Sequence, residues 1–131
     1  MAIEQQVFSI LSGFTGLTAL VPAAQIKVPG NWQNLVRPYI IHFPVSPDPV
    51  HTHDDSAVLP GVWDFYQIDV FADSYSSGRA VVAVIIANFR GLLTGGVEAF
   101  LRPGSFYLGQ DKLGEETVHH FALNYRIAEG P

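Results

Sequence analysis

Two segments in which apolar side chains recur at every second position constrain the fold of this 131-residue chain most strongly. A two-residue period is that of a β-strand, because successive side chains of a strand point to opposite faces of its sheet. In both segments one face carries a run of four apolar residues, which indicates a sheet that buries one face against a core. The two apolar faces are Tyr66, Ile68, Val70 and Ala72 in residues 62–72, and Phe121, Leu123, Tyr125 and Ile127 in residues 121–127.

The rest of the chain supplies the helices and shorter strands that complete such a sheet. In chain order we expect a helix over 3–13, an extended segment over 25–28, strands over 39–43 and 62–72, a helix over 79–93 and a hairpin over 106–127. The first two long strands form a hairpin with an acidic, Pro-rich loop at about 46–61. This order predicts a single domain over residues 1–131 of the α+β class: a mostly antiparallel sheet of four or five strands with two helices packed on one face.

The charge of the chain is negative and unevenly distributed. Seven Lys and Arg against twelve Asp and Glu give a formal net charge of −5, which disfavours sequence-independent binding to phosphate backbones. Neither Lys nor Arg occurs in residues 38–78, and this stretch contains Asp48, Asp54, Asp55, Asp64, Asp69 and Asp73. The middle third of the chain therefore predicts a localised acidic surface.

Other features of the composition exclude further classes of protein. The chain has no cysteine, so disulfides, thiolate nucleophiles and Cys-ligated metal sites are absent. No apolar run approaches the roughly 20 residues of a membrane span, and no basic residue before Lys27 marks the start of a secretory signal. We therefore expect synthesis in the cytoplasm and no membrane association.

The Pro-rich loop holds the best candidate for metal chemistry, the cluster His51, His53, Asp54 and Asp55. Other histidines that could complete a ligand set are His42, His119 and His120. A loop does not hold ligands rigidly, and adjacent histidines of a strand point to opposite faces, so a solvated loop tip is the favoured interpretation. No serine lies in a nucleophile elbow, and no catalytic residue or cofactor is expected. A small metal-dependent enzyme using this loop and a monomeric binding module stay open as alternatives.

More apolar surface is predicted than one small subunit needs. On the strand over 62–72, Trp63, Phe65 and Phe71 occupy the face opposite the core stripe, and Trp32 lies in a loop. The helix over 79–93 is apolar nearly all round, because Val81 and Val84 lie opposite its main stripe. We expect Trp63, Phe65, Phe71, Val81 and Val84 to contact a second copy or another partner.

The order and content of these segments resemble one family of proteins. They are IEQQVFSIL at residues 3–11, LTALV at 17–21, VP at 28–29, RPYIIH at 37–42, YQIDVFA at 66–72, a helix over 77–93 and FALNYRI at 121–127. In this order they resemble the tail-completion, or tail-terminator, proteins of long-tailed bacteriophages and of phage-derived particles such as gene transfer agents. The similarity extends over nearly the whole chain.

The resemblance implies an α/β fold, no catalytic residues and a structural role in a virion. In that family the subunits close into a ring, commonly a hexamer, that sits on the end of the tail tube and joins it to the head connector or stopper protein. It implies these partners and a position at the head–tail junction for this chain, after synthesis in the host bacterial cytoplasm. DNA passes through such a ring without specific binding, so we expect an acidic lumen or docking surface formed by Asp48, Asp54, Asp55, Asp64 and Asp69.

Overall fold

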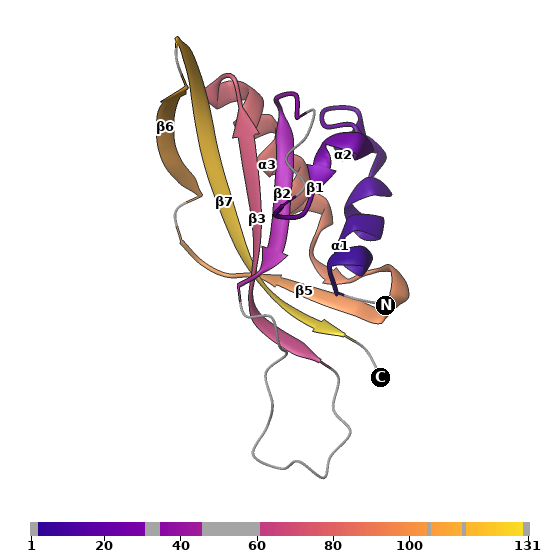
Figure 1. Ribbon diagram of the computed structural model, residues 1–131. Coiled ribbons are helices and arrows are strands. Elements are labelled where there is room, and N and C mark those ends of the chain that lie inside the picture. Colours follow the sequence, from indigo (N-terminus) through magenta and orange to yellow (C-terminus); the bar gives the residue numbers. More distant parts are fainter. Residues whose placement is uncertain (1–2, 31–34, 46–60, 105, 114, 130–131) are drawn as a thin grey trace.

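The computed structural model describes residues 3–30, 35–45, 61–104, 106–113 and 115–129, which form a twisted sheet with helices on one of its faces (Figure 1). The helices are α1 (Ile3–Ser12), α2 (Thr15–Thr18) and α3 (Tyr75–Asn88), with 3-10 turns at Ala23–Gln25 and Thr94–Gly96. The strands are β1 (Ile26–Lys27), β2 (Tyr39–Pro44), β3 (Val62–Ala72), β4 (Gly91–Leu92), β5 (Val97–Leu101), β6 (Tyr107–Leu113) and β7 (Glu116–Glu129).

The sheet is built around its two longest strands, β3 and β7. They run antiparallel, with Ile68 opposite Leu123 and Val70 opposite Phe121. The strand order is β1-β2-β3-β7-β5-β4, and β6 pairs with the other half of β7, beside the part that β5 occupies. Among the described residues this makes seven strands, of which only β1 and β2 pair in parallel.

One core lies between the sheet and the helices. The apolar stripes of β3 and β7 face it, and from the helices it receives the buried side chains of Ile3, Val7, Ile10, Leu11, Leu17, Val81, Val82 and Ile85. Helix α1 presents one apolar face because its buried residues recur every three or four positions. Within the described part of the chain, no helix combines the length and apolarity needed to cross a membrane.

The predicted fold class and the main elements are confirmed. The α1 helix, the β2–β3 and β6–β7 hairpins and the two alternating strands all occur, in an α+β fold with a mostly antiparallel sheet. The expected four or five strands and two helices are too few. The missed elements are the short helix α2 and the strands β4 and β5. Helix α2 and strand β4 have four residues or fewer, too few to show a periodicity, and β5 follows a glycine turn.

Helix α3 begins and ends closer to the N-terminus than the predicted helix over 79–93. Helix α3 begins at Tyr75, because the Ser74 side chain accepts a hydrogen bond from the Ser77 amide and caps it. It ends at Asn88, and Gly91 then adopts a positive φ of 67° as the chain turns into β4. The residues placed in the last turn of a helix over 79–93 therefore belong to a turn and an edge strand.

Candidate functional site

The second face of the sheet is covered by none of the described helices and is the first candidate site. Its upper half carries three stacked rings: Tyr39 on Phe71 with centroids 4.9 Å apart, and Phe71 on His120 at 4.3 Å. Beside the stack, Asp69 lies 3.5 Å from His120 Nε2 and accepts a 2.7 Å hydrogen bond from Gln67. This half of the face is closed by contacts between its own side chains.

The lower half of the same face is more open and more apolar. Val45, Phe65 and Phe100 are 54%, 46% and 51% exposed and lie in one row across the sheet, which we call the apolar row. The Val45 amide donates to the Phe65 carbonyl, and Phe100 is paired with Arg126 of β7, which lies 3.4 Å from Asp64. Exposed aromatic residues beside arginine are typical of protein-binding surfaces.

Arginine also shapes the apolar row directly. The Arg102 guanidinium lies 4.2 Å from the centroid of the Phe65 ring and donates to the Asp64 carbonyl. Of this surface, the sequence identified only Phe65 and Asp64. Val45, Phe100, Arg102 and Arg126 were missed, because they reach the row through strand pairing with residues distant in sequence.

The prediction that Trp63 shares this open face is wrong. Trp63 is 7% exposed and belongs to the core. The register of β3 on β7 shifts between Trp63 and Tyr66, so that Asp64 and Phe65 together occupy one position of the ladder. This β-bulge turns Trp63 to the same side as Tyr66, which simple alternation cannot foresee. Phe71 lies on the second face as predicted, although it is half-buried in the ring stack.

The second apolar side of α3 is also not available to a partner. Val81 is buried in the core, and Val84 is half-buried and packs against it, near Gly16 of α2. Apart from Tyr75 in the first turn, the exposed positions of the helix are alanines and polar residues. An apolar side of α3 therefore serves the subunit's own core through the short helix that the sequence did not reveal.

The expected acidic surface is only partly described. Asp48, Asp54 and Asp55 lie outside the described residues. Asp69 is 7% exposed and hydrogen-bonded, and Asp64 pairs with Arg126, so neither presents an unpaired carboxylate. Neighbouring side chains therefore partly balance both charges, although the Asp64 side chain is 45% exposed, and the acidic lumen or docking surface stays a prediction.

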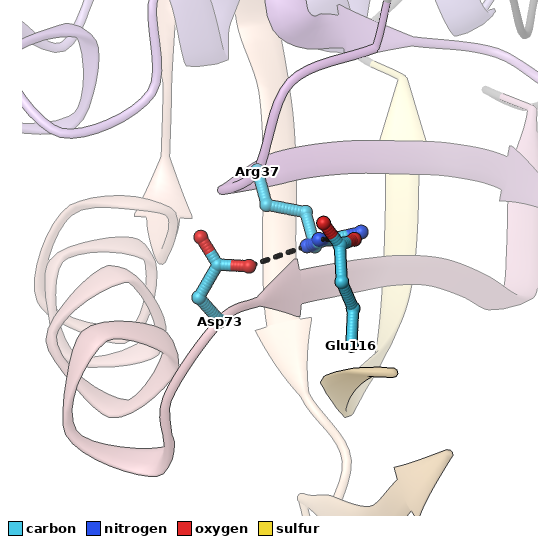
Figure 2. Close-up of polar contacts among 3 residues, drawn as sticks. All are labelled: Arg37, Asp73 and Glu116. Atoms are coloured by element: carbon cyan, nitrogen blue, oxygen red, sulfur yellow. Dashed lines mark hydrogen bonds and ion pairs between the residues drawn. The ribbon is translucent and has the colours of Figure 1, made fainter. Parts of the chain in front are cut away.

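An arginine holds the upper ends of three strands together. Figure 2 shows Arg37 between Asp73 and Glu116. Arg37 lies just before β2, Asp73 just after β3, and Glu116 at the start of β7. Its Nε donates to Asp73 Oδ1 at 2.5 Å, and a terminal nitrogen donates to Glu116. These bonds raise the pKa of the Arg37 guanidinium above its ordinary value. No sequence signal announced the group, whose members are 36 and 79 positions apart.

A groove between α1 and the β1–β2 edge is the second candidate site. It has a volume of about 1020 Å³, and Phe8, Val28 and Phe43 are among the apolar residues that line it. His42 also lines it, although the residue is fully buried. Its Nδ1 lies 2.7 Å from the Tyr66 hydroxyl, while its Nε2 has no hydrogen-bond partner among the described residues. Burial lowers the pKa of His42 to about 4, so the ring is neutral at pH 7.

The histidines of the described chain are not brought together. His119 Nδ1 lies 2.9 Å from the Tyr107 hydroxyl, whereas His120 faces Asp69 on the other side of β7, as predicted for adjacent strand residues. His51, His53 and Trp32 lie outside the described residues. Among the residues that the structure does describe, no group of three or more potential metal ligands occurs.

Comparisons with known proteins identify a shared fold. No protein-family model matches the chain, and no curated protein sequence matches it significantly. Among solved structures, a chain from "Virion of native gene transfer agent (GTA) particle" superimposes with a TM-score of 0.62 at 19% sequence identity. The superposition covers 98% of this chain and 96% of that chain. The two chains therefore have the same fold over almost their entire lengths.

Proposed function

We propose that this chain is a structural, non-enzymatic protein of a phage-like particle. The observation that carries the proposal is the fold it shares with a chain of a gene transfer agent virion over nearly the full length of both. The uncovered sheet face agrees with such a role, since virion proteins act by contacting one another. The apolar row of Val45, Phe65 and Phe100 is the kind of surface that such a contact buries.

Within the particle we propose the role of tail terminator. Subunits of this chain would close into a ring, a hexamer by family resemblance, that ends the tail tube and joins it to the head connector or stopper. The order of helices and strands that carries the resemblance is present in the fold. The apolar row would contact the tube or the connector. Arginines lie beside its aromatic residues, and this combination is typical of protein-binding surfaces.

The proposed ring surrounds the path of the DNA. A net charge of −5 per subunit would keep the lumen from binding phosphates tightly. Of the aspartates first assigned to that wall, Asp48, Asp54 and Asp55 stay candidates, while Asp64 and Asp69 have partners of their own. An assembly that placed these three residues on its outer rim would contradict the lumen assignment.

The mass of the assembled protein tests the role. Native mass spectrometry or mass photometry of the full chain should show a ring-sized oligomer, or a monomer that becomes one on purified tail tubes. In particles, antibody labelling or electron microscopy should place the chain at the head–tail junction, and particles lacking it should have unjoined heads and tails. A chain that stays monomeric with and without tubes, or that localises elsewhere in the particle, contradicts the proposal.

A further inference from the structure

The two edges of the sheet differ in shape. At one edge β1 is two residues long and pairs only with Ile40 and Ile41 of β2. The chain then passes through Pro29, which has no N–H with which to continue the pairing. The end of β2, from His42 to Pro44, therefore pairs with β3 on its inner side only, and its outer side forms one wall of the groove.

The backbone at this wall is turned toward the groove. The Val45 amide donates toward β3, to the Phe65 carbonyl. Because peptide groups alternate along a strand, the N–H and C=O of His42 and the C=O of Pro44 point the other way, to the outer edge.

The opposite edge projects outward. There β4 is also two residues long, and Leu92 is 73% exposed, more than any other large apolar residue that the structure describes. The Leu93 amide donates to Val97 within the sheet, so the peptide groups of Leu92 point away from it. This edge therefore offers an apolar side chain and unpaired backbone groups together.

The charges at the two edges are complementary. Glu4 and Lys27 line the groove, while Arg90 and Glu98 flank Leu92, since Glu98 is paired with it and Arg90 precedes β4. None of these four residues has an ion-pair partner within the described ranges 3–30, 35–45, 61–104, 106–113 and 115–129. Each edge therefore has one acidic and one basic residue, and each of these can pair with the opposite charge at the other edge.

We propose that the β4 edge of one copy of this chain docks into the groove of the next. Leu92 packs against Phe8 and Val28, and the outward-pointing peptide groups of Leu92 pair with those of His42. Arg90 pairs with Glu4 and Glu98 with Lys27. Such a contact joins two different surfaces, so it repeats from copy to copy and closes into a ring when the rotation permits. This inference rests on the proposed ring and assigns its subunit interface.

Substitution of the projecting side chain is the first test. Leu92→Asp should weaken self-association by roughly tenfold to hundredfold, because it buries a charge at the centre of the contact. Leu108→Asp is the matched control, since Leu108 is 57% exposed on β6, which pairs with β7 and with neither β2 nor β4. Mass photometry over a dilution series measures both. Equal association of Leu92→Asp and wild type overturns the inference.

A charge exchange tests the pairing itself. Arg90→Glu and Glu4→Arg should each weaken assembly, and the chain that carries both changes should recover it, because the exchanged pair attracts again. Circular dichroism of each variant distinguishes a lost contact from a lost fold. Two single variants that weaken assembly without rescue in the double variant contradict the Arg90–Glu4 pair and the docking geometry.

The absence of cysteine permits a direct test of proximity. A chain with Val28→Cys and Leu92→Cys should yield a ladder of cross-linked oligomers with a short bismaleimide, whereas Val28→Cys paired with Leu108→Cys should not. A wild-type ring without this ladder overturns the assigned interface and leaves the proposed function standing. A wild-type chain that is monomeric, alone and on tail tubes, overturns both.

Discussion

At the residue scale, a helical glycine packs closely against an aromatic ring. Gly78 is buried in the first turns of α3, directly against Phe121 of β7. A Cβ atom at this position would lie 2.8 Å from Phe121 Cδ1 and closer still to Cε1. The ring cannot give way easily, because Tyr75 and Tyr107 pack against it. Glycine at residue 78 therefore sets how closely α3 approaches the sheet.

Replacing this glycine should destabilise the subunit. Gly78→Ala is expected to lower the free energy of unfolding by roughly 1–3 kcal/mol, because overpacking outweighs the gain of about 1 kcal/mol in helix propensity. Gly16→Ala in α2 is the matched control, since its Cβ would meet Val84 at an ordinary 3.7 Å. Urea unfolding of both variants measures the difference. A Gly78→Ala chain as stable as Gly16→Ala would contradict the close approach.

The buried imidazole predicts a dependence of stability on pH. Below its ordinary pKa of about 6.5, His42 takes up a proton in the unfolded chain, whereas the folded chain resists protonation until about pH 4. Stability should therefore fall between these values, by roughly 3 kcal/mol at most, since one pKa unit is about 1.4 kcal/mol. Tyr66 contacts His42 directly, and Glu4 and Lys27 are the other titratable residues that line the groove.

A variant that cannot titrate isolates this effect. His42→Gln keeps a hydrogen-bonding side chain beside Tyr66 but has no proton to gain. The stability of wild type relative to His42→Gln should decrease when urea unfolding is repeated at about pH 4.5 instead of about pH 7. Carboxylates elsewhere titrate equally in both chains and cancel. If the two chains differ in free energy of unfolding by the same amount at both pH values, His42 accepts a proton as readily in the folded chain as in the unfolded one.

Individual positions were predictable only where local pattern decides them. Phe65 and Phe71 lie on the predicted face, and His119 and His120 lie on opposite faces, because a strand's alternation sets these directions. Trp63 departs from its predicted face because one extra residue shifts the alternation. Asp69 is buried because Gln67 and His120 surround it, and such partners are not apparent in a linear sequence.

At the element scale, the start of α3 depends on one hydroxyl. The Ser74 side chain accepts from the Ser77 amide at 3.1 Å, which satisfies one of the free amides of the first turn. Because α3 carries the close packing on Phe121, its first turn also positions Gly78. The cap therefore supports the helix–sheet contact as well as the helix.

Removing this cap should have a moderate cost. Ser74→Ala is expected to lower the free energy of unfolding by about 1 kcal/mol, whereas Ser74→Asp should preserve it, because a carboxylate also accepts the amide proton. Ser76→Ala controls for the loss of a hydroxyl in the same turn. Thermal unfolding followed by circular dichroism compares the variants, and a Ser74→Ala chain as stable as Ser76→Ala would exclude a role for the cap.

The elements that sequence could predict were those long enough to show a period. Helix α1 and strands β3 and β7 place their core residues at every second, third or fourth position, and this pattern identifies them. Strands β1 and β4 have two residues each and exist because longer neighbours pair with them. The candidate site shared this limit, since both the groove and the apolar row are made by such pairings.

At the scale of the whole molecule, the residues of the core are separate from the apolar row. The core lies between the sheet and the helices, whereas the apolar row lies on the face that none of the described helices covers. Residues of the row can therefore change with little effect on folding. This separation allows the proposed contact with the tube or connector to be tested in subunits that remain folded.

Substitution of the row should impair binding and spare the fold. A chain with Phe65→Thr and Phe100→Thr should unfold with a free energy within about 1 kcal/mol of wild type, because threonine also suits a strand. It should be captured less by purified tail tubes or connectors in a sedimentation assay. Leu20→Thr, an exposed apolar substitution outside the sheet, is the control. Unimpaired capture of the double variant would assign tube or connector binding to another face.

The β-bulge at Asp64 and Phe65 makes β3 one residue longer than its ladder with β7 requires. From Trp63 to Tyr66 the strand takes three steps, while its partner takes two, from Ile127 to Tyr125. Loss of Asp64 would thus leave Trp63 and Tyr66 facing the core and restore an unbroken ladder. Loss of a residue between Tyr66 and Phe71 would instead reverse one part of the strand. Among related sequences, β3 should therefore tolerate a change in length at this one site.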